Sequence, residues 1–224
     1  MSTKDGKDYL YLIWKSEKTR KQYIIGQLTK NGQYEFQYGE EVQSAINDGF
    51  KPLLCFPDLD KVYKDNRLFT IFTSRLPDKK RKNIQEILKK YDDYMLLKRS
   101  GARLPIDNLE FIDPILDFDK NITRIFYMAG VRHYLNCDGQ NCAHAIEITR
   151  GDEMFLRREP DNNYDSNAVQ FLDASGKVLG YISRYYSKGV TELLKLKKII
   201  CHIYNVDKNK NCNECMKVIM EIMN

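Results

Sequence analysis

Long apolar runs are missing from this sequence of 224 residues. No stretch reaches the roughly 18 consecutive apolar residues that a membrane-spanning helix needs. The first seven residues are polar and lack the apolar core of a secretory signal. We therefore expect a cytoplasmic protein that has no membrane partner.

A strong excess of one charge is also missing. The formal net charge is +5, and residues 1–120 hold 22 Lys and Arg against 19 Asp and Glu, while residues 121–224 hold 14 against 12. A protein that coats duplex DNA without regard to sequence carries a larger basic excess. Any contact with a nucleic acid is therefore expected to be a local pocket rather than a broad basic surface.

Catalytic motifs are scarce. The sequence has no GxSxG, no phosphate-binding loop and no thioredoxin-like CxxC, and its three histidines do not have the spacing of a metal triad. Residues 117–119 read Asp-Phe-Asp and imitate the metal-binding Asp-Phe-Gly of kinases, but neither a phosphate loop nor an HRD-like segment precedes them. We therefore predict a non-catalytic protein without a cofactor.

Six cysteines in a chain without an export signal argue against a disulfide framework. Cys55 and Cys201 lie in apolar runs and are expected in the core. The other four have spacings that could supply the thiolates of a zinc site, with His144 as a spare ligand: Cys137, Cys142, Cys212 and Cys215. Reduced cysteines without metal are the expectation, and zinc is the alternative that the sequence leaves open.

The first half of the chain is predicted to be a mixed α+β domain over residues 1–112. Strand-like runs occupy residues 9–14, 22–28 and 33–38, and Asn31-Gly32 between the last two is typical of a hairpin turn. Helical patterns cover residues 40–47, 68–76, 80–90 and 94–99, and residues 50–63, with two prolines, are expected to form an ordered loop.

The second half reads mostly as strands. An Asp-rich segment at residues 113–121 is the predicted linker, and the second domain is expected over residues 122–224. Its candidate strands are residues 124–134, 153–158, 167–172, 178–182, 198–206 and 216–222, with a helix at 185–196. Six short strands favour a small antiparallel β-barrel with one or two helices, because closure removes exposed edges. The fold class of the whole chain is thus α+β.

One turn in the second half is crowded with Asn and Asp. Residues 157–169 read as a strand, this turn and another strand, and short polar side chains favour such turns because they bond nearby backbone groups. The composition does not explain Tyr164, which must either tuck inward or offer its ring to a ligand.

Around this turn the sequence resembles the HIRAN domain. The blocks that carry the resemblance keep their order over about 80 residues: Gly130-Val-Arg132-His133-Tyr134, Gly151-Asp152, Arg158-Glu-Pro160 with Asn162, Tyr164-Asp165-x-Asn167-Ala-Val169 and Leu179-Gly180-Tyr181-Ile182-x-Arg184. The resemblance implies a six-stranded β-barrel with two helices. It also implies recognition of the 3′-hydroxyl end of single-stranded DNA.

Three of the implied ligand-binding residues would hold the base and the hydroxyl of a strand end. Tyr164, supported by Tyr181, would stack on base faces. Asp165 matches the family's acidic residue, which accepts the proton of the terminal hydroxyl and repels any additional phosphate. The alternatives remain open that Tyr164 packs within the turn and that Asp165 only caps it.

The other implied residues would hold the backbone. Arg132 and Arg184 would bind phosphate as charged donors, and Asn162 would read a base edge or a phosphate. His133 stands where DNA-binding members have a second Tyr, and Tyr181 replaces a His. A purely structural ion pair of Arg132 is the alternative.

The first half resembles, with looser motifs, the N-terminal subdomain of HipA-type serine/threonine kinases. Four blocks carry this likeness: residues 25–28, 34–38, 69–77 and 96–101. The kinase core that would follow is absent. The resemblance implies an alternative function, in which the chain docks on a separate HipA-type kinase as an antitoxin or accessory subunit. The sequence decides neither between DNA, RNA and protein as the ligand nor the oligomeric state.

Overall fold

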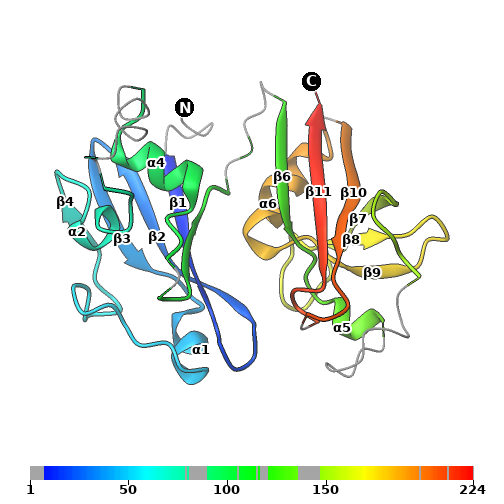
Figure 1. The fold of residues 1–224 in the computed structure, drawn as a ribbon, viewed down its shortest axis with the longest axis horizontal. Helices are drawn as coiled ribbons and strands as arrows, with labels where there is room; N and C mark the ends of the chain where they lie inside the picture. Colours follow the sequence, from blue (N-terminus) through cyan, green and yellow to red (C-terminus); the bar gives the residue numbers. More distant parts are fainter. Residues whose placement is uncertain are drawn as a thin grey trace. The chain divides into compact units, whose positions relative to one another are not determined.

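The computed structural model divides the chain into two compact units, residues 1–115 and 116–224, which we call the first and the second domain (Figure 1). The structure describes residues 8–78, 80, 90–104, 106–114, 116, 121–135, 147–196, 198–210 and 212–223. Each domain combines an antiparallel sheet of its own with a few short helices, as the predicted α+β class requires.

A five-stranded antiparallel sheet in the order β4-β3-β2-β1-β5 forms the first domain. Its strands are β1 (Asp8–Lys15), β2 (Gln22–Asn31), β3 (Gln33–Tyr38), β4 (Tyr63–Asp65) and β5 (Leu109–Ile112). The three predicted strands are confirmed, and Gly32, with a φ of 74°, makes the turn between β2 and β3. No pattern in the sequence predicts β4 or β5, because three or four residues are too few to show alternation.

The helices of the first domain that the structure describes are α1 (Val42–Asn47), α2 (Thr70–Thr73) and α4 (Asp93–Ser100). The side chain of Asp92 caps α4 by accepting a hydrogen bond from the backbone N–H of Met95 at 2.8 Å, and Gly101 ends the helix in the left-handed conformation. The helix predicted for residues 68–76 shrinks to the single turn α2, since Phe69 is still extended. The helix predicted for residues 80–90 lies almost entirely outside the described residues.

Aromatic rings fill the core of the first domain. The ring of Phe36 lies 4.6 Å from that of Phe56 and 5.4 Å from that of Phe72, and all three side chains are buried. The apolar run at residues 53–56 forms a turn that buries Phe56 but leaves Leu54 96% exposed. The prediction that Cys55 belongs to the core is therefore wrong, because the turn directs this residue to solvent.

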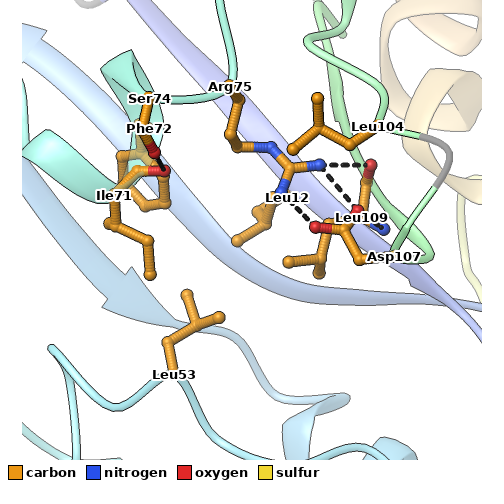
Figure 2. A pocket seen from close by; sticks show the side chains of 9 residues that line it. All are labelled: Leu12, Leu53, Ile71, Phe72, Ser74, Arg75, Leu104, Asp107 and Leu109. Atoms are coloured by element: carbon orange, nitrogen blue, oxygen red, sulfur yellow. Dashed lines mark hydrogen bonds and ion pairs between the residues drawn. The ribbon is translucent and has the colours of Figure 1, made fainter.

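A pocket of about 240 Å³ opens beside a buried arginine in the same domain (Figure 2). Arg75 donates to both carboxylate oxygens of Asp107 and to the backbone carbonyls of Ala102 and Leu109. Its charge is thus paired and four of its five N–H donors are bonded within the fold. Most of the other residues that line the pocket are apolar: Leu12, Leu53, Ile71, Phe72, Leu104 and Leu109. Arg75 thus ties the segment after α2 to β5 and is a structural group.

A six-stranded antiparallel sheet forms the second domain, in the order β6-β11-β10-β7-β8-β9 (Figure 1). Its strands are β6 (Ile122–Tyr127), β7 (Glu153–Arg158), β8 (Val169–Leu172), β9 (Val178–Tyr181), β10 (Lys198–Val206) and β11 (Met216–Met223), and its described helices are α5 (Val131–Tyr134) and α6 (Arg184–Leu193). Just after β6, Ala129 pairs with Tyr181 of β9 through two backbone hydrogen bonds of 2.8 and 2.9 Å. The sheet is thus curled so far that its first and last strands meet.

One predicted strand of the second domain is partly wrong. The run at residues 124–134 ends as a strand at Tyr127, and its last four residues form α5. Gly130 has a φ of 72°, which turns the chain out of the sheet directly after the bridge at Ala129. The other five strands and α6 lie where the sequence predicts them, within two or three residues at their ends.

The cysteines of the second domain differ from the expectation. Cys201 is buried as predicted, and the thiol of Cys215 donates to the backbone carbonyl of Cys212 at 3.4 Å, but the sulfur of Cys212 is bonded in a disulfide. Spacing along the chain does not reveal which thiols the fold brings together, so the expectation of wholly reduced cysteines is wrong here. Cys137 and Cys142 lie outside the described residues, and within the described ranges no group of three His, Cys, Asp or Glu side chains could hold a metal. No helix in the described ranges is long and apolar enough to span a bilayer.

Candidate functional site

The loop between β7 and β8 carries the candidate aromatic residue. The side-chain oxygen of Asn162 accepts hydrogen bonds from the backbone N–H groups of Tyr164, at 2.9 Å, and of Asp165, at 3.1 Å. The ring of Tyr164 is 86% exposed. The alternative that Tyr164 packs within the turn is therefore wrong. The side-chain oxygen of Asn162 thus fixes the turn, and less of the hydrogen-bonding capacity of this side chain is left for a ligand.

Asp165 joins the same loop to helix α6. One carboxylate oxygen accepts from the backbone N–H of Asn167 at 2.8 Å, and the other accepts from the hydroxyl of Ser187 at 2.7 Å. Asp165 as a whole residue is half-buried. A carboxylate offers about four acceptor positions, and these two bonds occupy half of them. Asp165 therefore caps the turn and still has room to accept one more hydrogen bond.

Arg184 also connects α6 to the loop. It is exposed, and one of its guanidinium nitrogens donates to the backbone carbonyl of Tyr164 at 3.1 Å. A guanidinium group has five N–H donors in a planar arrangement and can bind more than one acceptor at a time. The exposed ring and a cation thus lie at the same end of the domain.

Helix α5 presents the other basic residue. Arg132 and His133 are both exposed, and in the described part of the chain neither side chain makes a hydrogen bond or an ion pair. The alternative of a structural ion pair for Arg132 has no counterpart among the described residues. α5 follows directly after the bridge between Ala129 and Tyr181, which holds it beside β9.

Glu159 is the centre of a hydrogen-bond network that connects these elements. Its carboxylate accepts from the hydroxyl of Tyr181 at 2.9 Å, from the amide of Asn162 at 2.6 Å and from the amide of Gln170 at 3.0 Å. The hydroxyls of Tyr181 and Tyr134 are 2.6 Å apart. Because Tyr181 gives its single proton to Glu159, Tyr134 must be the donor between them. The network therefore runs from α5 through β9 to the loop of Tyr164.

The network also affects the ionisation of Tyr181. Burial, followed by the hydrogen bonds with Tyr134 and Glu159, raises the pKa of the Tyr181 hydroxyl well above its ordinary value. Tyr181 is consequently a neutral donor at any physiological pH. Its hydroxyl is engaged in the fold, while its ring, half-buried beside that of Tyr134, lies 5.7 Å from it in an edge-on arrangement.

The structure thus brings the predicted residues to one end of the second domain, but by two routes. Hydrogen bonds connect five of them directly or through Glu159, as described above: Asn162, Tyr164, Asp165, Tyr181 and Arg184. Arg132 and His133 are held there only by the position of α5. Glu159 and Tyr134 lie within the HIRAN-like motifs, but the sequence predicts no role for them, because a motif does not show which group a carboxylate or a hydroxyl bonds.

Comparison with known proteins identifies a family for most of the second domain. The family model described as the HIRAN domain matches residues 123–223. These residues form a HIRAN domain. Two solved structures resemble it: the HIRAN domain of human HLTF, at 18% identity over 47% of this chain and 81% of that one with a TM-score of 0.34, and a protein from Lactobacillus plantarum, at 18% identity over 46% and 97% with a TM-score of 0.32. No curated protein matches the chain.

The comparisons give no support to the predicted likeness of the first domain to HipA-type kinases. The family match begins after the first domain and covers the second domain alone. The alternative function, docking on a separate kinase as an antitoxin, therefore has no support either.

Proposed function

We propose that the HIRAN domain binds the 3′-hydroxyl end of a single DNA strand and catalyses no reaction. The observation that carries the proposal is the exposed ring of Tyr164 on a loop whose backbone is fixed by side-chain hydrogen bonds. A ring that protrudes from a rigid loop loses little conformational freedom on binding, so most of the stacking energy contributes to affinity.

Selectivity for an end would come from Asp165. Its carboxylate uses about half of its acceptor positions within the fold, and the residue is half-buried. A terminal hydroxyl can donate to such a carboxylate, whereas a terminal phosphate brings a second negative charge close to the first and is repelled. Arg184 and Arg132, both exposed, would bind the phosphate that lies one step back from the end.

The test compares oligothymidines of equal length that end in a 3′-hydroxyl or a 3′-phosphate, with a circular single strand that has no end. We expect binding of the hydroxyl end at least tenfold tighter than that of the other two. Equal affinity for all three would refute end recognition. An RNA oligonucleotide of the same length is measured as well. Tighter binding of RNA than of DNA would identify RNA as the ligand instead.

The variant Tyr164→Ala should weaken binding of the 3′-hydroxyl oligonucleotide by about 5- to 100-fold, the loss of one stacked base. The thermal unfolding midpoint should stay unchanged, because the ring is 86% exposed. Phe155→Ala is the matched control, since Phe155 is an exposed aromatic residue on β7 (48% exposed) outside the proposed site. Unchanged binding by Tyr164→Ala would rule out the stacking role.

A further inference from the structure

A row of aromatic and basic side chains crosses the outer face of the HIRAN domain's sheet on three strands. These strands, β6, β11 and β10, are adjacent (Figure 1). Tyr127 of β6 is paired across the strands with Lys217 of β11, and Lys217 is paired with Asn205 of β10. Tyr204 precedes Asn205 at an irregularity of β10, where the register shifts. We call Tyr127, Lys217, Tyr204 and the neighbouring Arg150 the outer row.

The alternation of burial shows that the outer row faces away from the core. Met216 and Val218, on either side of Lys217, are buried, as is Ile203 before Tyr204. Tyr204 is 39% exposed, while Tyr127 and Lys217 are half-buried. Successive side chains of a strand point to opposite faces, which places Tyr127 and Lys217 on the outer face. The register shift of β10 interrupts this alternation at Tyr204, and its exposure places that side chain on the outer face as well.

Each tyrosine of the outer row has a cation above its ring. The ammonium of Lys217 lies 5.0 Å from the ring centre of Tyr127, and the guanidinium of Arg150 lies 5.8 Å from that of Tyr204. The backbone beside Arg150 is fixed, because the N–H of Gly151 donates to the carbonyl of Ile203 at 2.8 Å. Exposed cation–π contacts are weak, so both cations can move to a phosphate while a base takes their place on the ring.

The outer row continues from the site already described. Tyr127 and Ala129 are two residues apart and therefore share a face, and Ala129 is paired with Tyr181 of the hydrogen-bond network. From Tyr181 the path crosses one strand spacing of about 5 Å to Ala129 and then follows the chain for about 7 Å to Tyr127. Two further strand spacings of about 5 Å each lead to Tyr204. A polymer held at the Tyr164 loop can thus follow one continuous surface.

The charged residues of the outer face favour one course for a bound strand. Further along the same face lies a second set of paired residues, which begins with two isoleucines and ends with a carboxylate: Ile125, Ile219, His202 and Glu153. The carboxylate of Glu221 on β11 lies beyond this set. A phosphate backbone is attracted to the two cations of the outer row and repelled by the two carboxylates. The favourable course therefore stays on the outer row.

We propose that the outer row is a second binding site, which holds the part of the DNA strand upstream of its 3′ end by stacking bases on Tyr127 and Tyr204 and binding phosphates with Lys217 and Arg150. This inference rests on the proposed function. A strand of a few nucleotides would fill only the end site, and a longer one would cover both sites.

The test measures affinity for 3′-hydroxyl oligothymidines of about three and about twelve nucleotides, because small strand-binding barrels cover about 4–16 nucleotides, so the first length lies below that range and the second lies within it. The wild type should bind the long strand at least tenfold tighter. Tyr204→Ala should weaken binding of the long strand by about 5- to 10-fold and leave the short one unchanged, while Tyr204→Phe, which keeps the ring, should retain wild-type affinity. Phe155→Ala, an exposed aromatic change on the same sheet away from the outer row, should affect neither.

A second measurement does not depend on Tyr204. Arg150→Ala, at an exposed turn residue, should lower the slope of log affinity against log salt concentration by about 0.7 for the long strand alone. Equal binding of both strands by the wild type, or unchanged long-strand binding and salt slope in both variants, would overturn the inference while leaving the end site intact. Failure of the wild type to bind either strand would instead refute the proposed function, and the outer row with it.

Discussion

Replacing Glu159 by alanine should both destabilise the HIRAN domain and weaken its binding of a strand end. The carboxylate accepts three hydrogen bonds, from Tyr181, Asn162 and Gln170, at 2.6–3.0 Å. Only Gln170 is fully buried, at 6% exposure, so its amide cannot find water in the variant, while the other two donors can be partly rehydrated. At about 1 kcal/mol for each bond, and somewhat more for the buried amide, we expect a loss of about 2–4 kcal/mol.

Urea unfolding measures this loss directly. With a slope of about 1–3 kcal/mol/M, the unfolding midpoint should fall by about 1–2 M in Glu159→Ala. Glu153→Ala is the matched control, because it removes an equal charge from the exposed start of β7 and should change the stability by less than about 0.5 kcal/mol. Equal midpoints for the two variants would refute the central role of Glu159.

A double-mutant cycle separates the network from simple packing. Tyr181→Phe removes only the hydroxyl that donates to Glu159, so its effect and that of Glu159→Ala should not add, with a coupling of about 1 kcal/mol. Binding of a 3′-hydroxyl oligonucleotide should fall about tenfold in Glu159→Ala, because Asn162 loses a partner that orients it towards the backbone of Tyr164. Strict additivity in the cycle, with undiminished binding, would show that the three donors act independently.

Two further predictions concern the stability of the two domains. Asp107→Asn should destabilise the first domain at pH 7 by about 2 kcal/mol, since Arg75 keeps its buried charge without its carboxylate partner. Partial burial acts to raise the pKa of Asp107, but the hydrogen bonds and charge of Arg75 outweigh it and hold this pKa below the ordinary value of 3.8. A lowered pKa in the folded state adds stability that is present above the ordinary pKa and is lost as the pH falls through the folded value. The wild-type advantage in urea unfolding should therefore shrink below about pH 4, and an advantage that persists unchanged at pH 2 would contradict the ion pair. Gly180→Ala should lower the thermal unfolding midpoint of the HIRAN domain, at a cost of about 1–3 kcal/mol, because an added Cβ would lie 2.5 Å from the carbonyl oxygen of Ala129 and force the bridge to Tyr181 open; an unchanged midpoint would show that the backbone yields without cost.

The order of strands along the chain could be predicted because each depends on a local pattern. In the second domain β7 and β10 begin and end at the predicted residues, and β3 does so in the first. Alternating burial over six or more residues produces a signal that the sequence shows directly. The exceptions had other causes: β4 and β5 are too short for a pattern, and α5 continues an apolar run after a left-handed glycine.

By itself the sequence determined the residues of the candidate site and the family of the second domain, because separated motifs in a fixed order are visible along the chain. Only the tertiary structure decided what these residues do for one another. It exposed the ring of Tyr164, engaged both carboxylate oxygens of Asp165 and placed Glu159 between three donors. Hydrogen-bond partners far apart in the sequence, such as Glu159 and Tyr181, are selected by how the sheet closes, and closure depends on all six strands at once rather than on any local run.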